Sequence, residues 1–293
     1  MDGSQKPNVL KRLIPVIIGI LVFGILYVLM LNLYKSEGNA GEAKVFGSQT
    51  EDMVITAKLI SIDPIKGDVT ARLQFSPQGS FINAEDGTLA QSLLLDLNSA
   101  SGKTEINFKK NEKMNPVDMV VSLYDGDVMS YPFDEHAADL YVGLSSVMET
   151  EGQPKEFTAV PFKVDFSGAL SGYSISAEEL QKKEDGYTEI YLTIARSSSV
   201  LFFAIFIMVL QWLLAIVAVS VTLTCLITGR KIEATLFSWM GALLFALVPL
   251  RNAMPSVPPV GALADYLSFF WAEILVAVSL VIFVYTYLSR PLK

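Results

Sequence analysis

The sequence predicts a membrane α-helical bundle of four spans joined to an extracytoplasmic all-β domain that folds as an antiparallel sandwich. Four long apolar runs, an acidic middle segment and a one-sided distribution of basic residues indicate this class. Of the 293 residues, 52% are hydrophobic and 18% are charged, whereas soluble domains carry roughly 25% charged residues. Residues 35–197 hold 14 basic and 26 acidic residues, a net charge of −12, and the other residues hold 8 basic and 4 acidic ones.

The first span is predicted at residues 13–34, after a cytoplasmic tail at 1–12. Its first 19 residues, 13–31, contain no charge, and as a helix they would be about 28 Å long, enough to cross hydrocarbon. We expect this segment to remain as an anchor. A cleaved signal peptide is the alternative, since Ala40 and Ala43 lie downstream, although the apolar core of a signal peptide is shorter, about 7–15 residues.

Three further spans are predicted at residues 199–228, 234–250 and 266–288, followed by a cytoplasmic tail at 289–293. Lys and Arg concentrate in cytoplasmic loops, and the basic residues that flank the spans fall on one side if the chain crosses four times. They are Lys6, Lys11, Arg12, Arg230, Lys231, Arg290 and Lys293. We therefore expect both termini in the cytoplasm, residues 35–197 outside the cell, and the chain in the plasma membrane.

The segment between the first two spans alternates polar and apolar residues with the period of β-strands. We expect eight strands, at 53–62, 68–75, 92–97, 104–109, 117–123, 137–144, 156–165 and 188–195. Short strands at this spacing favour an antiparallel sandwich, with a barrel as the alternative. One stretch, Ala177–Lys183, resembles a helix. The last strand reaches the second span through three serines, too short a junction for a flexible linker, which predicts a rigid connection.

Tyr131-Pro132-Phe133-Asp134 stands just before the strand predicted at 137–144. Proline fixes its own backbone and holds the preceding residue extended. We expect Phe133 to fill the core and Asp134 to accept backbone N–H groups, which would make the segment a structural corner. The functional alternative is a signalling corner that touches the membrane layer.

An acidic group surrounds His136, the one histidine of the chain. Its members are Asp125, Asp127, Asp134, Glu135 and Asp139. Calcium takes about six to eight oxygen ligands, but the Asp-x-Asp-x-Asp-Gly spacing of a calcium loop is missing, so we expect no metal site. We expect His136 in an exposed loop, with a pH-sensing role as the alternative because carboxylates favour its protonated form.

Three charges beside the last two spans are candidates for a site at or within the membrane. Arg251 ends the third span, Asp265 precedes the fourth, and Glu273 lies about 10 Å along the fourth by helical rise. An ionisable group at that depth is costly unless it is paired. We expect Arg251 to pair with Asp265 or Glu273, either as a structural lock or as part of a proton, ion or lipid path. The Pro-rich loop 251–265 is expected to form a stiff cap under the external domain.

Four segments together resemble an uncharacterised family of four-span membrane proteins found chiefly in actinobacteria. They are Leu59–Gly67, Tyr131–Asp134, Leu250–Pro255 and Pro258–Gly261. The resemblance covers residues 44–289. It implies the same topology and supplies no catalytic residues.

A second resemblance concerns the corner Tyr131–Asp134 and the strand 191–196 that enters a span directly. Both are similar to the corresponding parts of pentameric ligand-gated ion channels. In that family a β-sandwich sits on a helical bundle and drives a pore, which would make this chain a channel component. The chain differs in having one span before the domain and three after it, no cysteine loop, and no charged ring in its third span.

No catalytic or cofactor-binding motif is found, neither a Walker loop nor a zinc spacing nor a dinucleotide fingerprint. The acidic domain argues against nucleic acid, whose phosphates bind Lys and Arg. We therefore expect a non-enzymatic surface module without a cofactor, which contacts the lipid bilayer and binds a ligand or partner as an accessory or sensor subunit of a homo-oligomer or membrane complex. A channel or transporter component is the alternative, and a membrane enzyme is a third hypothesis without a motif behind it.

Overall fold

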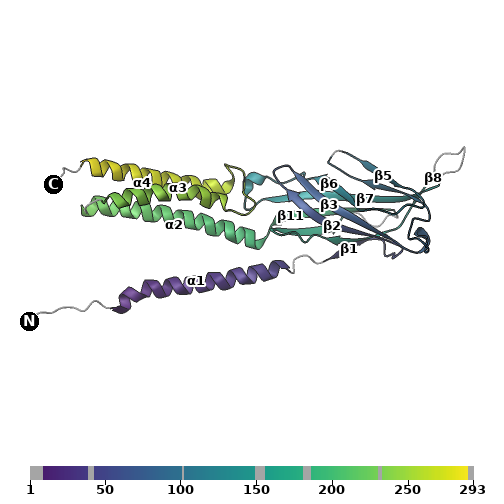
Figure 1. Ribbon diagram of the computed structural model, residues 1–293, viewed down its shortest axis with the longest axis horizontal. Coiled ribbons are helices and arrows are strands. Elements are labelled where there is room, and N and C mark those ends of the chain that lie inside the picture. Colours follow the sequence, from purple (N-terminus) through teal and green to yellow (C-terminus); the bar gives the residue numbers. More distant parts are fainter. Residues whose placement is uncertain are drawn as a thin grey trace, which may run out of the picture. The chain divides into compact units, whose positions relative to one another are not determined.

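The computed structural model describes residues 9–38, 43–100, 102–148, 156–180, 186–229 and 233–289 (Figure 1). The chain divides into two compact units, Met1–Ala40 and Gly41–Lys293. The first unit contains helix α1, Val9–Gly38, which includes the predicted first span and extends beyond its expected end at residue 34. This helix is long and apolar enough to cross a membrane.

The second unit begins with a β-sandwich of two sheets (Figure 1). The first sheet has the order β1 (Lys44–Gly47), β9 (Lys163–Ser167), β2 (Met53–Asp63), β3 (Asp68–Pro77), β6 (Val117–Ser122). The second sheet has the order β10 (Tyr173–Glu179), β11 (Tyr187–Arg196), β7 (Glu135–Met148), β4 (Ser92–Leu97), β5 (Thr104–Phe108), and β8 (Glu156–Ala159) pairs with β7. Among the described pairs, β2 and β9 are parallel and the others antiparallel. The predicted sandwich is confirmed.

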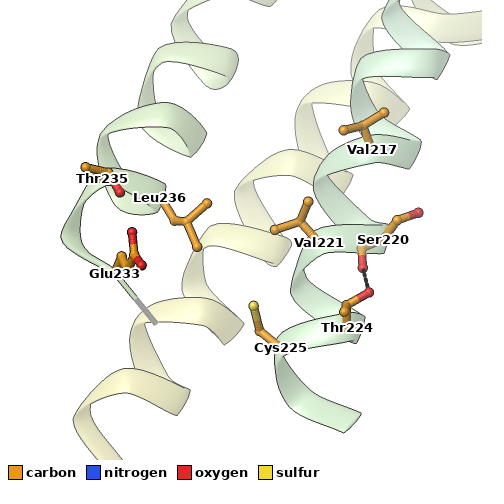
Figure 2. Close-up of a pocket in the computed structure, with 8 residues that line it drawn as sticks. All are labelled: Val217, Ser220, Val221, Thr224, Cys225, Glu233, Thr235 and Leu236. Atoms are coloured by element: carbon orange, nitrogen blue, oxygen red, sulfur yellow. Dashed lines mark hydrogen bonds between the residues drawn. The ribbon is translucent and has the colours of Figure 1, made fainter. Parts of the chain in front are cut away.

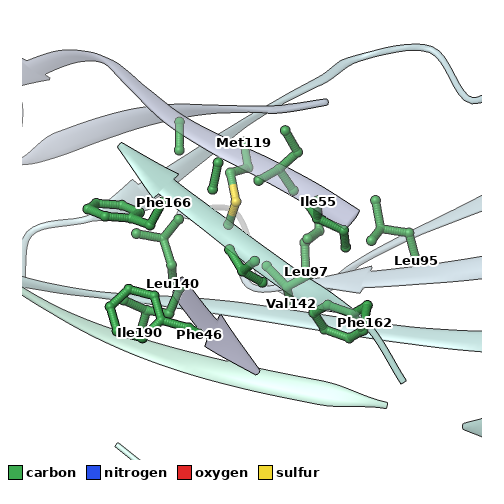
Figure 3. Packing of buried hydrophobic residues seen from close by; sticks show 14 of the residues in the cluster. Phe46, Ile55, Leu95, Leu97, Met119, Leu140, Val142, Phe162, Phe166 and Ile190 are labelled. Carbon is green, nitrogen blue, oxygen red and sulfur yellow. The ribbon is translucent and has the colours of Figure 1, made fainter. Parts of the chain in front are cut away.

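The inner faces of the two sheets share one hydrophobic core, because inward and outward positions alternate along each strand. In β4 the inward residues Leu93, Leu95 and Leu97 are at most 1% exposed. Figure 3 shows Ile55 of the first sheet and Leu140 of the second among these packed side chains. All the buried members of this core come from the sandwich, so its packing does not draw on the helices.

The single strand predicted at 156–165 is wrong. The segment forms two strands: β8 pairs with β7 in one sheet, and β9 pairs with β1 and β2 in the other. The chain changes sheets at Pro161, which has no N–H to donate to a ladder. Val160 and Phe162 flank the proline and are buried in the core, so apolar patterning alone did not reveal the break.

The helix predicted at Ala177–Lys183 is also wrong. Residues 173–179 form β10, which pairs along its whole length with β11, and residues 181–185 lie outside the described residues. The Ala-Glu-Glu-Leu composition favours a helix locally, but strand pairing and inward contacts override a weak propensity. Strand β1 was not predicted because four residues are too few to display a period.

Helices α2 (Ser198–Thr228) and α3 (Ala234–Asn252) follow the sandwich, and a π-helical turn η3 (Asp265–Phe269) leads into α4 (Phe270–Ser289). These helices pack on one another (Figure 1). Together with α1 they give four helical segments long and apolar enough to cross a membrane, which is the mark of a multi-pass membrane protein. Two short 3-10 turns, η1 (Gly79–Phe81) and η2 (Val128–Ser130), lie in the sandwich loops.

Polar contacts hold α2 at its start and in its middle. At its start, the hydroxyl of Ser197 accepts a hydrogen bond from the backbone N–H of Val200, which caps the helix directly after β11. In its middle, Ser268 Oγ donates to Gln211 Oε1 at 2.7 Å. Trp212 Nε1 donates to the backbone oxygen of Leu267 at 2.9 Å. The predicted connection is short, since a single residue, Ser197, separates the end of β11 from the start of α2.

Candidate functional site

The base of the sandwich meets the helices at a buried ion pair between Asp134 and Arg196. Arg196 ends β11, and Asp134 stands just before β7. Arg196 Nε lies 3.0 Å from Asp134 Oδ1, and Nη2 lies 2.7 Å from Oδ2. Burial disfavours the charged guanidinium, but the hydrogen bond and charge of Asp134 outweigh burial and raise the pKa of Arg196 above its ordinary value. The guanidinium of Arg196 is therefore held charged, in a charge-assisted contact away from water.

Tyr131 connects this ion pair to the loop between α3 and η3. Its side chain is fully buried, and its hydroxyl donates to the backbone oxygen of Pro255 at 2.8 Å. Its own backbone oxygen accepts a hydrogen bond from Ala264 N at 3.1 Å. The guanidinium carbon of Arg196 lies 5.2 Å from the ring centre, within reach of a cation–π interaction. Desolvation raises the pKa of Tyr131 to about 12, so the hydroxyl remains a donor at neutral pH.

The rest of the corner differs from the prediction. The Tyr131–Pro132 peptide bond is cis, and Pro132 is buried. Phe133 is 54% exposed and does not fill the core, so that expectation is wrong. The buried aromatic residue is Tyr131, which packs against Val200 and neighbouring helix residues rather than in the sandwich core. The carboxylate of Asp134 bonds side chains, not the backbone N–H groups expected of it.

His136 lies in β7 and is buried, so its predicted place in an exposed loop is wrong. Its Nε2 lies 3.1 Å from Asp134 Oδ2, and its Nδ1 lies 3.3 Å from the backbone oxygen of Asp125. The position has the same inward parity as Ala138 and Leu140. That parity was readable from the sequence once the strand was known to begin at residue 135.

The acidic residues around His136 act separately. Asp127 Oδ1 accepts from Met129 N, Asp125 Oδ1 accepts from Gly126 N, and Asp139 Oδ1 accepts from the hydroxyl of Tyr124. Within the described ranges, no group of three or more His, Cys, Asp or Glu residues is arranged to hold a metal ion. Glu135 is exposed at the start of β7.

A second buried ion pair joins Arg251 to Asp265, across the loop between α3 and η3. Of the two pairings predicted for Arg251, the structure shows the one with Asp265. Arg251 Nε lies 2.8 Å from Asp265 Oδ1, and Nη2 lies 2.8 Å from Oδ2. The same Nη2 donates to Pro259 O at 2.9 Å, and Gly261 N donates to Asp265 Oδ2 at 2.8 Å. The pair thus ties the end of α3, the Pro-rich loop and the start of η3 into one cap.

Glu273 lies on α4, and Arg251 pairs with Asp265 rather than with it. Its Oε2 is buried and has no hydrogen-bond partner among the described residues. The Nε2 of Gln211 on α2 is in the same condition. Unsatisfied polar atoms among apolar helices are costly, so these two side chains lower the stability of the helical region.

Sequence reasoning missed two residues of the junction, Arg196 and Tyr173. It also missed Gln211 in the middle of α2. Tyr173 lies with its ring centre 5.0 Å from the Arg196 guanidinium carbon and its hydroxyl 3.2 Å from Nη1. One signal for Arg196 was available: it has the same parity as Ile190, Leu192 and Ile194, all inward, so a charge at that position had to find a buried partner.

One hollow lies at the junction of sandwich and helices, and another lies between two of the helices. One, of about 580 Å³, separates the β2–β3 turn from the Pro-rich cap and is lined by Ile65, Tyr173, Arg196 and Val257 among others. The other, of about 540 Å³, lies between the end of α2 and the start of α3 (Figure 2). Its lining is Val217, Ser220, Val221, Thr224, Cys225, Glu233, Thr235 and Leu236. The first hollow belongs to the junction and the second does not.

Comparison with known proteins gives two matches that meet at this junction. A family model described as Domain of unknown function (DUF8686) matches residues 196–290. Another, described as Domain of unknown function (DUF4436), matches residues 46–194, just over half of the chain. No curated protein matches. The predicted resemblance to an uncharacterised family is confirmed, and the chain belongs to the DUF4436 family of unknown function.

Proposed function

We propose that this chain is a non-enzymatic subunit of the plasma membrane whose external sandwich binds a ligand or partner and passes the effect to its helices. One observation carries the proposal. The fully buried Tyr131 connects two buried ion pairs: its ring lies beside Arg196 of the Asp134–Arg196 pair, and its hydroxyl bonds Pro255 of the loop that the Arg251–Asp265 pair closes. No flexible linker interrupts this path, since β11 ends at Arg196 and α2 begins at Ser198.

A displacement of β7 or β11 must move this junction. Asp134 precedes β7 and is bonded to the last residue of β11, so sliding between the two strands strains the ion pair. Tyr131 carries the strain to the Pro-rich cap through Pro255, and Arg251 carries it to α3 and η3. Buried charge pairs have few alternative geometries, so the junction favours concerted movement over local yielding.

Hydrogen–deuterium exchange of the full chain in lipid nanodiscs tests this coupling. We expect Asp134→Asn to accelerate exchange in residues 252–264 and in the first turns of α2. The matched control is Asp118→Asn, which removes the same charge from an exposed pair with Arg72 on the other sheet. Faster exchange confined to the sandwich in Asp134→Asn would contradict a coupled junction.

The proposal places both termini in the cytoplasm and residues 35–197 outside, on the distribution of Lys and Arg. Single cysteines in a Cys225→Ala background test it. Ser80 is exposed in the sandwich and Glu233 is exposed between α2 and α3. A membrane-impermeant maleimide should label Ser80→Cys on intact cells and label Glu233→Cys only after permeabilisation. The reverse pattern would invert the topology.

A second candidate is a channel component related to pentameric ligand-gated channels. It is favoured by the corner Tyr131–Asp134 lying against the α3–η3 loop and by the unpartnered Oε2 of Glu273 within the helices. Planar-bilayer recording of purified oligomers tests it, with Glu233→Ala as the control for Glu273→Ala. Unitary currents lost only in Glu273→Ala would favour a channel, and silent oligomers of verified size would exclude one. We also infer an actinobacterial type, which the distribution of the family among genomes would test.

A further inference from the structure

The outer face of the second sheet carries a hollow of about 360 Å³ that the junction does not use. It is lined by Asp96, Leu97, Asn98, Ser99, Gly102, Lys103 and Tyr141. Asp96 and Tyr141 occupy outward positions on β4 and β7, next to buried inward neighbours. The hollow is therefore built on two paired strands rather than on a loose loop alone.

Asp96 is the chemically incomplete group in this hollow. Its Oδ2 lies 2.8 Å from Lys103 Nζ, and its Oδ1 is buried without a hydrogen-bond partner in the described part of the chain. Glu105, the residue opposite Asp96 on β5, lies 3.6 Å from the same Nζ. Two carboxylates thus share one ammonium group, and a buried carboxylate oxygen without a donor is costly.

The aromatic side chain of Tyr141 stands beside this carboxylate in the hollow. Its ring is supported by Tyr187 of β11, with ring centres 6.0 Å apart and an angle of 27° between the planes. Gly143 makes the approach possible, since a Cβ there would lie 3.3 Å from both Asp96 Cβ and Tyr141 Oη. Burial, followed by the charge of Asp96, raises the pKa of Tyr141, so its hydroxyl stays neutral. Tyrosine faces beside a carboxylate are the usual setting for an organic cation.

Asn98 holds the backbone on both sides of Leu140, including that of Tyr141. Its Nδ2 donates to the backbone oxygen of Asp139 at 2.7 Å, and its Oδ1 accepts from Tyr141 N at 2.8 Å. These two bonds fix Asn98, the residue after β4, to the backbone of β7 at Asp139 and Tyr141. A site whose walls are already fixed loses less freedom when a ligand binds.

We propose that this hollow binds a small organic cation through a primary ammonium group seated on Asp96 beside Tyr141. This names a ligand class for the receptor-like role and rests on that proposed function. Lys103, whose side chain is 64% exposed, occupies the ammonium position in the absence of ligand and is displaced by it. An alkylammonium has three N–H donors and can serve both oxygens of Asp96. The net charge of −12 on residues 35–197 attracts cations and repels anions.

Calorimetric titration of the full chain in nanodiscs with putrescine tests the site. We expect saturable binding that Asp96→Asn weakens by about tenfold or more, as loss of a charged hydrogen bond requires. Lys103→Ala should strengthen binding because it removes the competing ammonium group. Asp118→Asn should leave binding unchanged, and 1,4-butanediol, the neutral analogue of putrescine, should not bind.

Several outcomes would overturn this site. The first is no binding to the wild-type chain, and the second is equal affinity of the wild type and Asp96→Asn. The third is weaker binding in Lys103→Ala, which removes only an exposed side chain. Failure of the site and failure of the proposed function are distinguishable. Putrescine binding that leaves exchange in residues 252–264 unchanged would keep the site and remove the coupling. Absence of binding, with the Asp134→Asn effect intact, would remove the site alone.

Discussion

Loss of the Asp134 side chain should destabilise the protein strongly. Its side chain is inaccessible to solvent, and Arg196, its partner, is 3% exposed. Asp134→Ala leaves that guanidinium buried without a counter-charge, which costs about 3–5 kcal/mol. We expect a matching fall in the free energy of unfolding of the full chain, measured by urea titration in detergent micelles.

Asp118→Ala is the control for this substitution, because the Arg72–Asp118 pair has a similar bonding geometry but is nearly half exposed. Exposed pairs contribute little. Equal destabilisation by the two substitutions would mean that the Asp134–Arg196 contact is not a special feature of the junction.

Tyr131 should make the stability of the folded chain depend on pH at alkaline values. Its pKa is raised to about 12 in the folded chain, above about 10 in an unfolded one. The unfolded state therefore loses the phenolic proton first, and this contribution to stability, complete below pH 10, declines as pH rises through 12. The decline in stability between pH 10 and 12 should be smaller in Tyr131→Phe. An identical decline in both proteins would show that other groups cause it.

At the scale of elements, the Arg251–Asp265 pair holds α3, the cap and η3 together. Asp265→Ala removes the acceptor of three hydrogen bonds, two from Arg251 and one from Gly261, and should cost about 3–5 kcal/mol by leaving a buried guanidinium unpaired. Arg251→Lys should be intermediate, because one ammonium cannot reproduce the planar fork that also reaches Pro259. The temperature of aggregation in detergent measures both, and a harmless Asp265→Ala would contradict the lock.

Elements with a strong period could be predicted from sequence, and the others could not. The four apolar runs were found by their length and lack of charge. Strands such as β4, at Ser92–Leu97, were found because burial of one face imposes an alternating pattern. The break at Pro161 and the strand β10 were missed because pairing partners, not local composition, decide them. The ion pair at Arg251 was predicted from the cost of a charge at the membrane. Predicting that Arg196 is buried and paired requires knowing that it points inward in β11.

The hollow at Asp96 could not be read from the sequence at all. It depends on Gly143, Tyr141 and Asp96 lying side by side, and they are neighbours only through the register of β4 on β7. A function that arises from strand register leaves no motif along the chain, which is why the sequence suggested a binding module but not where it binds.

For the whole molecule, the two family matches meet at residues 194–196, and the hydrophobic clusters of the sandwich and the helices are also separate. The sandwich core is composed entirely of sandwich residues, whereas Tyr131 belongs to a cluster with α2 and the cap. Residues 43–197 expressed alone should therefore fold with a β-rich circular dichroism spectrum and a cooperative transition, at lower stability than in the full chain.

The same division predicts a context-dependent effect of Tyr131→Phe. In the full chain the substitution removes the hydrogen bond to Pro255 and should cost about 0.5–1.5 kcal/mol. In the excised sandwich Pro255 is missing and Tyr131 faces water, so the substitution should be close to neutral. The full chain and the excised sandwich, each with and without Tyr131→Phe, are compared by urea unfolding. The difference between the two costs is the interaction energy between Tyr131 and the cap. Equal costs in both contexts would mean that Tyr131 serves the sandwich alone and does not join it to the helices.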